Sequence, residues 1–255
     1  MSNPLVSVII PFYNSSKFIE QTLSSVVKQS YQNIEIIVFD DGSEPTESIA
    51  LEKTLSKFPT VQLYKGKNGG QSAARNRAIM KSQGKYILPL DSDDIIGVEY
   101  IKSAVVVLEL SYDIKIVYCK AEYFGERTGL IKLPKFNIKR FAVENQIFSS
   151  ALYRREDWES SGGYCEGLLF WEDWDFWISL LKNGGIGHCL PEVLFYYRVR
   201  QDGMRKSASK KVKQFAIQKL NERHTDFFKN YLGGPLRQKR SWSRLINQIT
   251  KIICT

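Results

Sequence analysis

Short apolar runs alternate with amphipathic segments through the first hundred residues of the chain. Four runs predict strands buried on both faces of a sheet, at residues 5–11, 34–39, 61–64 and 86–90. Between them, apolar positions recur at helical spacing after Ser15 or Ser16, after Pro45 and after Gly69-Gly70. Strands and helices in this order are typical of a mostly parallel, doubly wound α/β sheet.

Beyond residue 97 the pattern is less regular. Helical spacing predicts helices at 98–110, 171–181 and 207–232, the last ending at Gly233-Gly234-Pro235. Partial alternation of apolar and polar residues predicts strands at 115–124, 149–154 and 193–197. We therefore expect one large domain followed by a tail.

The composition is that of an ordinary soluble protein, with 43% hydrophobic and 25% charged residues among 255. No run approaches the roughly 18 apolar residues that span a bilayer, and residues 1–14 lack a signal-peptide pattern. Cys119, Cys165, Cys189 and Cys254 are too scattered for a zinc site or a disulfide scaffold. We expect a cytoplasmic protein with buried or incidental thiols.

The net charge of +9 is concentrated in the tail. Residues 1–197 carry 21 Lys and Arg against 24 Asp and Glu, whereas residues 198–255 carry 15 against 3. Beyond residue 235, Trp242, Leu245 and Ile249 fall on one helical face with basic residues close by. Such a segment suits anionic lipid, nucleic acid or a phosphorylated carrier, although a solvated basic surface or packing onto the domain explains it equally.

Three carboxylates lie in the turn Asp91-Ser92-Asp93-Asp94, directly after the run at 86–90. The carboxyl end of a buried strand is where an open α/β sheet binds its ligand. Carboxylates this close repel one another unless a cation or hydrogen-bond donors hold them, which favours a hard divalent metal and a phosphorylated substrate. A polar helix cap is the alternative interpretation.

Polar clusters also follow two other predicted strands, Phe12-Tyr13-Asn14 and Asp40-Asp41-Gly42-Ser43. In a parallel sheet all three clusters share one edge, which predicts a nucleotide pocket. Tyr13 can stack on a base, Asp41 can accept a hydrogen bond from it, and Arg75 can pair with phosphate. Taken singly, each has another interpretation: Tyr13 as a packing residue, the Asp41 cluster as a plain turn, and Arg75 as a solvated helix residue.

Several function classes lose support because their motifs are absent. No Gly-x-Gly-x-x-Gly follows a strand and no P-loop sequence occurs, so dinucleotide redox enzymes and P-loop hydrolases are disfavoured. The two histidines, His188 and His224, lie outside the acidic clusters, which leaves no nucleophile triad.

A second acidic centre, Trp171-Glu172-Asp173-Trp174-Asp175-Phe176-Trp177, begins the predicted helix at 171–181. A carboxylate among bulky aromatic rings is partly desolvated, which raises its pKa toward values useful for a general base. The alternative to a general base is that these acids only stabilise the N-terminus of the helix through its dipole. The tryptophan rings can form either an apolar wall on which a sugar stacks or part of the core.

Five ordered segments together resemble one family. They are Val6-Ser7-Val8-Ile9-Ile10-Pro11-Phe12-Tyr13-Asn14, Asp40-Asp41-Gly42-Ser43, Asn68-Gly69-Gly70 with Ala73-Ala74-Arg75-Asn76, Asp91-Ser92-Asp93-Asp94, and Gly162-Gly163-Tyr164 with Glu172-Asp173-Trp174-Asp175. The chain resembles the inverting glycosyltransferases of family 2, which use the GT-A fold, and among them bacterial enzymes of O-antigen and capsular polysaccharide synthesis.

The resemblance implies a GT-A domain at 1–205, with a nucleotide-binding half at 1–97 and an acceptor-binding half at 98–205. A basic helical extension at 206–255 would follow. Nucleotide contacts would come from Pro11, Tyr13, Asn14, Asp41, Arg75 and Asp91. Asp91 and Asp93 would form the Asp-x-Asp element that binds ribose and Mn²⁺ or Mg²⁺, and Asp173, with Glu172 beside it, would be the catalytic base.

One position departs from the family pattern. Many members place a histidine two residues after a late Tyr-Arg pair, whereas this chain reads Tyr197-Arg198-Val199-Arg200. Arg200 would then supply a fixed positive charge to the leaving group. We count Asp94, Trp171, Arg198 and Arg200 as candidate contacts of the leaving group or acceptor.

The expected reaction is transfer of a hexose from a nucleotide sugar, UDP-galactose or UDP-glucose, to a hydroxyl of a polyprenyl-diphosphate-linked saccharide. The enzyme would work in the cytoplasm at the inner face of the membrane, held there by its basic tail. A nucleotidyltransferase and a non-enzymatic nucleic-acid-binding protein are the alternatives, although the sequence has no recognised nucleic-acid-reading module.

Overall fold

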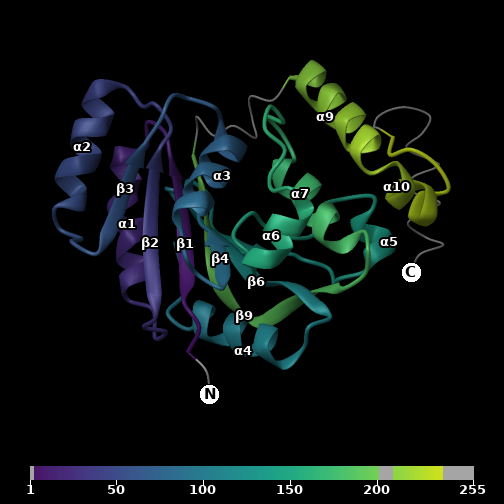
Figure 1. Ribbon diagram of the computed structural model, residues 1–255, viewed down its shortest axis with the longest axis horizontal. Coiled ribbons are helices and arrows are strands. Elements are labelled where there is room, and N and C mark those ends of the chain that lie inside the picture. The colour runs from purple at the N-terminus through teal and green to yellow at the C-terminus, as the bar shows by residue number, and fades with distance from the viewer. Residues whose placement is uncertain (1–2, 201–208, 238–255) are drawn as a thin grey trace.

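The computed structural model describes residues 3–200 and 209–237, and within them nine strands form one sheet (Figure 1). The strands are β1 (Val6–Phe12), β2 (Ile34–Asp40), β3 (Val61–Lys65), β4 (Tyr86–Pro89), β5 (Ile95–Ile96), β6 (Ile114–Gly125), β7 (Gly129–Ile131), β8 (Leu152–Arg154) and β9 (Ile186–Val199). The helices are α1 (Ser16–Val27), α2 (Pro45–Leu55), α3 (Gln71–Lys81), α4 (Tyr100–Leu110), α5 (Ile138–Phe141), α6 (Arg155–Ser161), α7 (Glu172–Leu181), α9 (Lys210–Arg223) and α10 (Thr225–Leu232).

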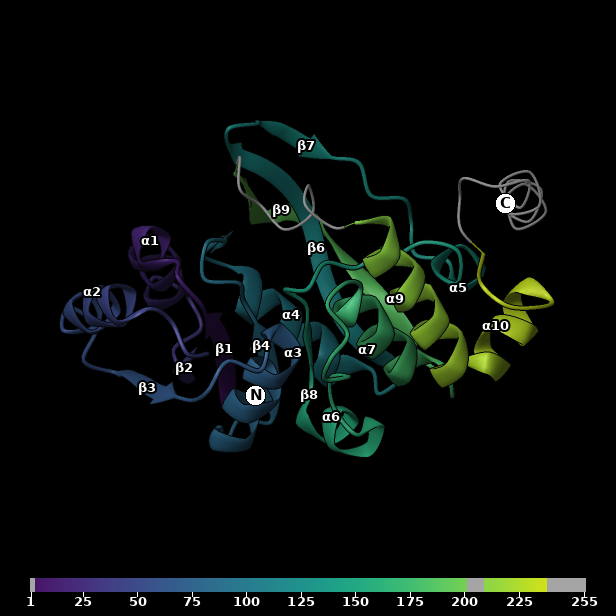
Figure 2. The same cartoon turned by 90° about the horizontal axis from the view of Figure 1, so that it is seen from above.

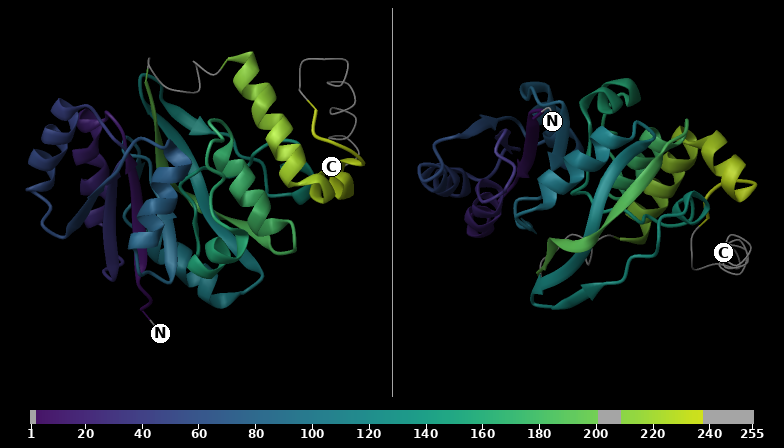
Figure 3. Two further views of the ribbon diagram at one scale, coloured as in Figure 1. Left: turned by 45° about the horizontal axis from the view of Figure 1, so that its top comes forward. Right: turned by 90° about the horizontal axis from the view of Figure 1, so that it is seen from below.

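The sheet has a parallel half and a mixed half. Its strand order is β3-β2-β1-β4-β8-β6-β9-β5, with β7 paired to β6. The first four strands run parallel, as the alternating pattern predicts. From β4 onward, β8 pairs antiparallel with β4 and β6, whereas the long strands β6 and β9 are parallel to each other. Figures 2 and 3 show β6, β7 and β9 reaching past the rest of the sheet.

Two apolar cores lie on the two faces of the sheet. Side chains alternate along β1, so that Val6, Val8 and Ile10 join one core while Ile9 joins the other. Helices α1, α2 and α4 cover the first core, and α3, α5, α7, α9 and α10 contribute to the second. Burial on both faces explains why β1 is almost entirely apolar, with Ser7 as its one polar residue.

The later elements differ most from the sequence prediction. The predicted strand at 193–197 is the end of a longer strand, β9, and the predicted helix at 207–232 is divided into α9 and α10 at His224. His224 leaves helical geometry at φ −129° and ψ 36°, and Gly233 ends α10 at φ +68°. The short elements β5, β7, α5 and α6 were not predicted.

Two further expectations concern thiols and membranes. Cys119, Cys165 and Cys189 are free, and Cys254 lies outside the described residues. Among the helices of residues 3–200 and 209–237, none is long and apolar enough to cross a bilayer.

Candidate active site

The three polar clusters predicted from sequence converge at one edge of the sheet. Strand β1 lies between β2 and β4, and all three run in the same direction. Phe12 pairs with Asp40 at the ends of β1 and β2, and Asp91 follows the end of β4. Helices α1, α2 and α3 begin at this edge, so their N-terminal N–H groups favour an anionic ligand there.

Asp40 and Asp41 have different partners. Asp40 accepts hydrogen bonds from the Ser43 N–H at 3.0 Å and the Ser48 hydroxyl at 2.7 Å, and so closes its own turn. Asp41 accepts from the N–H groups of Gly69 at 3.0 Å and Gly70 at 2.8 Å. Burial raises the pKa of Asp41, and these two N–H groups act against that shift. Asp41 therefore anchors the loop that leads into α3.

The residues after β1 form the outer wall of this edge. Pro11 is buried, whereas 52% of Tyr13 is exposed, which leaves its ring accessible to a ligand. Asn14 adopts a left-handed backbone conformation at φ 45°. Its side-chain oxygen accepts from the Glu44 N–H at 2.9 Å and its own N–H donates to the Ser43 hydroxyl at 3.1 Å. Asn14 thus joins the turns that follow β1 and β2.

Arg75 connects the acidic turn to the second acidic centre. Its guanidinium is fully buried and lies 2.8 Å from Asp91 Oδ1 and 3.0 Å from Glu172 Oε1. Burial alone lowers the pKa of Arg75, but Asp91 and Glu172 outweigh it and hold the pKa above its ordinary value. Gln71 and Ser149 also donate to Asp91, at 2.8 and 3.2 Å. Two acidic clusters far apart in sequence therefore form one site.

Arginines at the end of β9 and just after it bind Asp93 and Asp94, the other two acids of the turn. The Arg198 N–H donates to Asp94 at 2.8 Å, and Arg198 Nε donates to the Asp93 carbonyl at 2.7 Å. Arg200 Nε lies 3.3 Å from the Asp93 carboxylate. Burial raises the pKa of Asp93, the Asp91 carboxylate raises it further, and Arg200 opposes both. The side chain of Asp93 therefore favours a further positive charge beside it.

The donor atoms of Asp91 and Asp93 suit a hard divalent cation. Both side chains offer carboxylate oxygens, the ligands that Mg²⁺ and Mn²⁺ prefer. In the part of the chain that the structure describes, no group of three or more His, Cys, Asp or Glu side chains is arranged as a metal site. A cation here would need further oxygen ligands from a substrate, as Mg²⁺ commonly has at phosphate sites.

The second acidic centre lies at the start of α7, and its Asp173 side chain accepts two hydrogen bonds. Asp173 Oδ1 accepts from the Trp174 N–H at 2.7 Å, and Oδ2 accepts from Asn145 Nδ2 at 3.0 Å. Asp173 is partly exposed, so a ligand can approach it. Asn145 was not predicted, because no sequence pattern connects it to α7.

The three tryptophans of this centre have different environments. Trp174 and Trp177 are buried in the core, and Trp174 Nε1 donates to the Phe141 carbonyl at 3.0 Å. Trp171 is partly exposed and has a left-handed backbone, φ 62°, which a bulky residue rarely adopts. Only Trp171 is therefore available to stack on a sugar, since the other two rings are core residues.

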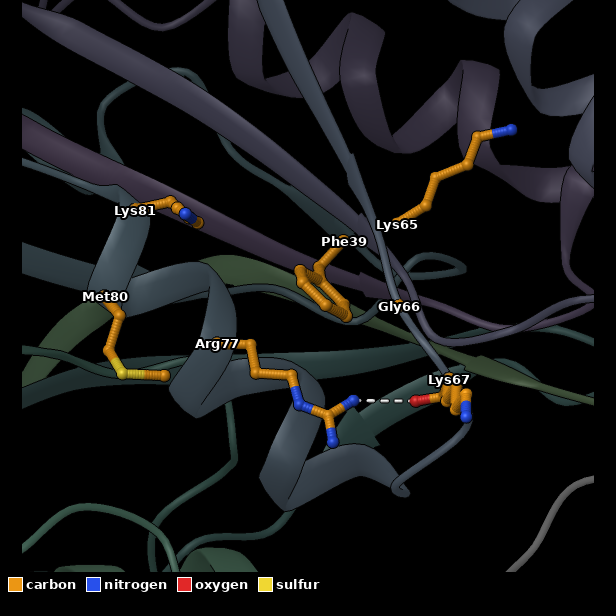
Figure 4. A pocket seen from close by; sticks show the side chains of 7 residues that line it. All are labelled: Phe39, Lys65, Gly66, Lys67, Arg77, Met80 and Lys81. Carbon is orange, nitrogen blue, oxygen red and sulfur yellow. Dashed lines mark hydrogen bonds between the residues drawn. The ribbon is translucent and has the colours of Figure 1, made fainter.

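A separate basic cavity of about 500 Å³ lies between β3 and α3 (Figure 4). Its lining includes Lys65, Lys67, Arg77 and Lys81 around the ring of Phe39. Arg77 donates to the Lys67 carbonyl at 2.7 Å and lies 3.5 Å from Asp41. Arg77 thus supports the Gly69-Gly70 loop from behind, and the cavity does not contain the acidic turn.

A profile of the family described as "Glycosyl transferase family 2" matches residues 7–175, which is more than half of the chain. The chain belongs to glycosyl transferase family 2. The match includes all three strand-end clusters and ends at Asp175 in α7.

This family 2 chain is similar to a protein named for teichoic acid biosynthesis. It is 30% identical to "Minor teichoic acid biosynthesis protein GgaA" of Bacillus subtilis (strain 168) over 213 residues, covering 78% of this chain and 48% of that protein. The chain thus spans about half the length of this curated relative.

Two solved structures show the same fold. The chain matches S. aureus TarS in complex with UDP-GlcNAc at a TM-score of 0.68 and 22% identity, covering 88% of this chain and 74% of that one. It matches "Mannosyltransferase PcManGT from Pyrobaculum calidifontis in complex with GDP-Man and Mn2+" at 0.71 and 18%, covering 99% and 75%. The expected GT-A fold is confirmed.

Replacing Arg75 tests whether it joins the two acidic centres. The substitution Arg75→Met should lower the free energy of unfolding by about 3–5 kcal/mol, because Asp91 and Glu172 would face each other without a counter-charge. Chemical denaturation measures the change. Lys57→Met, which removes the exposed ion pair with Glu20, is the matched control and should have a much smaller effect. Equal losses in the two variants would contradict the bridging role.

Proposed function

We propose that this family 2 member is an inverting glycosyltransferase that uses a nucleotide sugar in bacterial surface polysaccharide or teichoic acid synthesis. The observation that carries the proposal is the continuous polar site from Asp91 and Asp93 through Arg75 and Glu172 to Asp173. It combines a place for a diphosphate leaving group with a carboxylate open to an acceptor. Family membership and the teichoic acid relative support the same reaction class.

The proposed reaction is a single in-line displacement at the anomeric carbon. Asp173 accepts the proton of an acceptor hydroxyl as the oxygen attacks, and Asn145 with the Trp174 N–H fixes the carboxylate for that transfer. The configuration inverts because only one displacement occurs. Glu172, which is paired with Arg75, positions the start of α7 and does not take the proton.

The leaving group is a nucleoside diphosphate held at the acidic turn. Asp93 and Asp91 would hold Mn²⁺ or Mg²⁺, which supplies charge stabilisation for the departing diphosphate. Arg200 adds a fixed positive charge on the same side. The Mn²⁺ and GDP-mannose of the PcManGT structure support such an arrangement in this fold.

For the donor we propose a UDP-hexose, with UDP-galactose and UDP-glucose as the first candidates. The TarS structure contains UDP-GlcNAc, which supports a UDP-sugar. The base of the nucleotide would contact Pro11, Tyr13 and Asn14. Asp41 would fix the Gly69-Gly70 loop next to that base. Trp171 is the ring available to a sugar.

For the acceptor we propose a saccharide linked to polyprenyl diphosphate at the inner face of the membrane. The basic tail supports this proposal through its composition, since residues 198–255 carry 15 Lys and Arg against 3 Asp and Glu. Trp242, Leu245 and Ile249 belong to that tail and lie outside the described residues.

The catalytic base is tested by Asp173→Asn. The variant should lose at least about a hundredfold in sugar transfer, a typical contribution of general base catalysis. Its donor dissociation constant should stay within about twofold of wild type, because Asp173 does not contact the nucleotide. A screen of UDP-sugars by donor hydrolysis and thermal stabilisation identifies the donor first. Asp113→Asn, an exposed acid, is the control, and near wild-type turnover of the Asp173 variant would exclude this base.

Metal dependence is tested at Asp93. Asp93→Asn should raise the Mn²⁺ concentration needed for half-maximal activity by at least about tenfold, because one anionic ligand is lost. Titration of Mn²⁺ into chelator-treated enzyme, followed by activity and by manganese electron paramagnetic resonance, measures the shift. Asp113→Asn again serves as control. Full activity of the wild type in excess chelator would show that Arg198 and Arg200 suffice without a metal.

The membrane proposal is tested by neutralising the tail. Replacing Lys239, Arg240, Arg244 and Lys251 with Gln should weaken binding to anionic vesicles at least about tenfold, since each basic residue near such a surface contributes about 1 kcal/mol. Vesicle sedimentation measures binding, and neutral vesicles are the control. Unchanged binding would remove the tail from the explanation.

A further inference from the structure

The helix pair α9 and α10 packs beside the second acidic centre. Figures 1 and 2 show α9 next to α7 and α10 beyond it, near α5. Both helices contribute to the same core as α7, through Leu220, Phe227 and Phe228. These helices follow the part of the chain matched by the family profile, which ends at residue 175.

A buried polar contact joins the helix pair to α7. Asp175 is fully buried, and its Oδ1 accepts from Arg223 Nε at 2.9 Å and lies 2.8 Å from His224 Nε2. His224 is also buried, at the break between α9 and α10. The close contact assigns the proton to Nε2, which donates to the carboxylate. The last residue of α9 and the residue at the break thus both donate to the start of α7.

This contact is a poor way to gain stability. Burying a carboxylate costs several kcal/mol before its partners compensate, and an apolar residue of similar volume often stabilises a fold as well or better. Among the residues that the structure describes, Asp175 Oδ2 and His224 Nδ1 are buried and have no hydrogen-bond partner. In some proteins a buried charge pair fixes one geometry, because a shifted helix would leave the charge without its partners.

An aromatic contact reaches α5 from the same helix pair. Phe227 of α10 packs edge-to-face on Phe141 of α5, with centroids 6.5 Å apart. Phe141 packs in turn on Trp174 of α7 at 6.4 Å, and its carbonyl accepts the Trp174 indole N–H. The helix pair therefore supports both α7 and α5.

Both contacts lead to Asp173. Asp175 is two residues after Asp173 in the first turn of α7, and Asn145, which donates to Asp173 Oδ2, is four residues after Phe141. The two segments that orient the carboxylate are thus the two that the helix pair holds.

We infer that α9 and α10 position Asp173, with His224 and Phe227 as positioning residues that act through Asp175 and Phe141. This inference rests on the proposed function, because it assigns Asp173 the role of base. A displacement of about 1 Å at a reacting group can cost about a hundredfold in rate, so a small shift of α7 is enough to lower turnover.

The test compares His224→Leu with His224→Gln and Asn221→Ala in the whole 255-residue chain. His224→Leu removes one of the two donors to Asp175 and leaves Arg223, and His224→Gln restores the second donor by its side-chain amide. The two side-chain hydrogen bonds of Asn221, at 2.7 and 3.0 Å, go to the backbone of Leu236 and not to α7, so Asn221→Ala is the matched control for packing of the helix pair.

We expect a split between turnover and donor binding. His224→Leu should lower kcat about tenfold, with donor binding within about twofold of wild type. His224→Gln should recover to within about threefold of wild type, and Asn221→Ala should leave kcat within about twofold. Phe227→Leu is a conservative change that keeps the site apolar, and it should also lower kcat because it weakens the contact with Phe141. It provides a second variant if His224→Leu does not fold.

A spectroscopic readout separates this inference from the proposed function. With 5-fluorotryptophan incorporated, the ¹⁹F resonance of Trp174, assigned by Trp174→Phe, should shift in His224→Leu and Phe227→Leu but not in Asn221→Ala. If wild-type protein transfers no sugar, the proposed function fails while this measurement still tests the coupling to α7. An unchanged resonance, equal loss of kcat in Asn221→Ala, or no recovery in His224→Gln would overturn the inference.

Discussion

The geometry of the site depends on one buried cation, the guanidinium of Arg75. It lies between carboxylates from two separate parts of the chain, Asp91 after β4 and Glu172 at the start of α7. Without it, the two acids would repel each other across a poorly solvated space. The small residues Ala74 and Ala78 let α3 lie close to the sheet, and that close packing brings Arg75 to the carboxyl end of the strands. One ion-pair bridge thus makes a single site of two acidic clusters.

The acidic turn itself is held from the opposite direction by β9. Arg198 binds the backbone of Asp93 and the side chain of Asp94, and Arg200 reaches the Asp93 carboxylate. Arg198 belongs to β9, which pairs with β6 along its length, and Arg200 follows the last residue of that strand. The acidic turn is therefore shaped by both halves of the sheet.

Much of this arrangement could be predicted from the sequence, for reasons of local chemistry. Buried parallel strands leave mostly apolar runs, and the polar residues Tyr13, Asp41 and Asp91 follow their carboxyl ends. Other features depend on contacts between distant segments. Asn145 meets Asp173 only because α5 packs on α7, and the break at His224 depends on where Asp175 lies. The tryptophans of α7 could not be sorted into core and surface by sequence, because helical spacing does not show which neighbours cover each ring.

The pairing of β6 with β9 has a consequence for how the chain assembles during synthesis. In the parallel half, β1 pairs with β2 after one crossover, as Val6 does with Ile34, but its other edge pairs with β4, where Val6 faces Tyr86. Ile114 likewise pairs with Ile186, so β6 is made well before its longest partner exists. Closing a longer loop costs more conformational entropy, and domains with distant pairings fold more slowly. Each half of the sheet therefore keeps an unpaired strand edge until a strand made much later has emerged, β4 for β1 and β9 for β6.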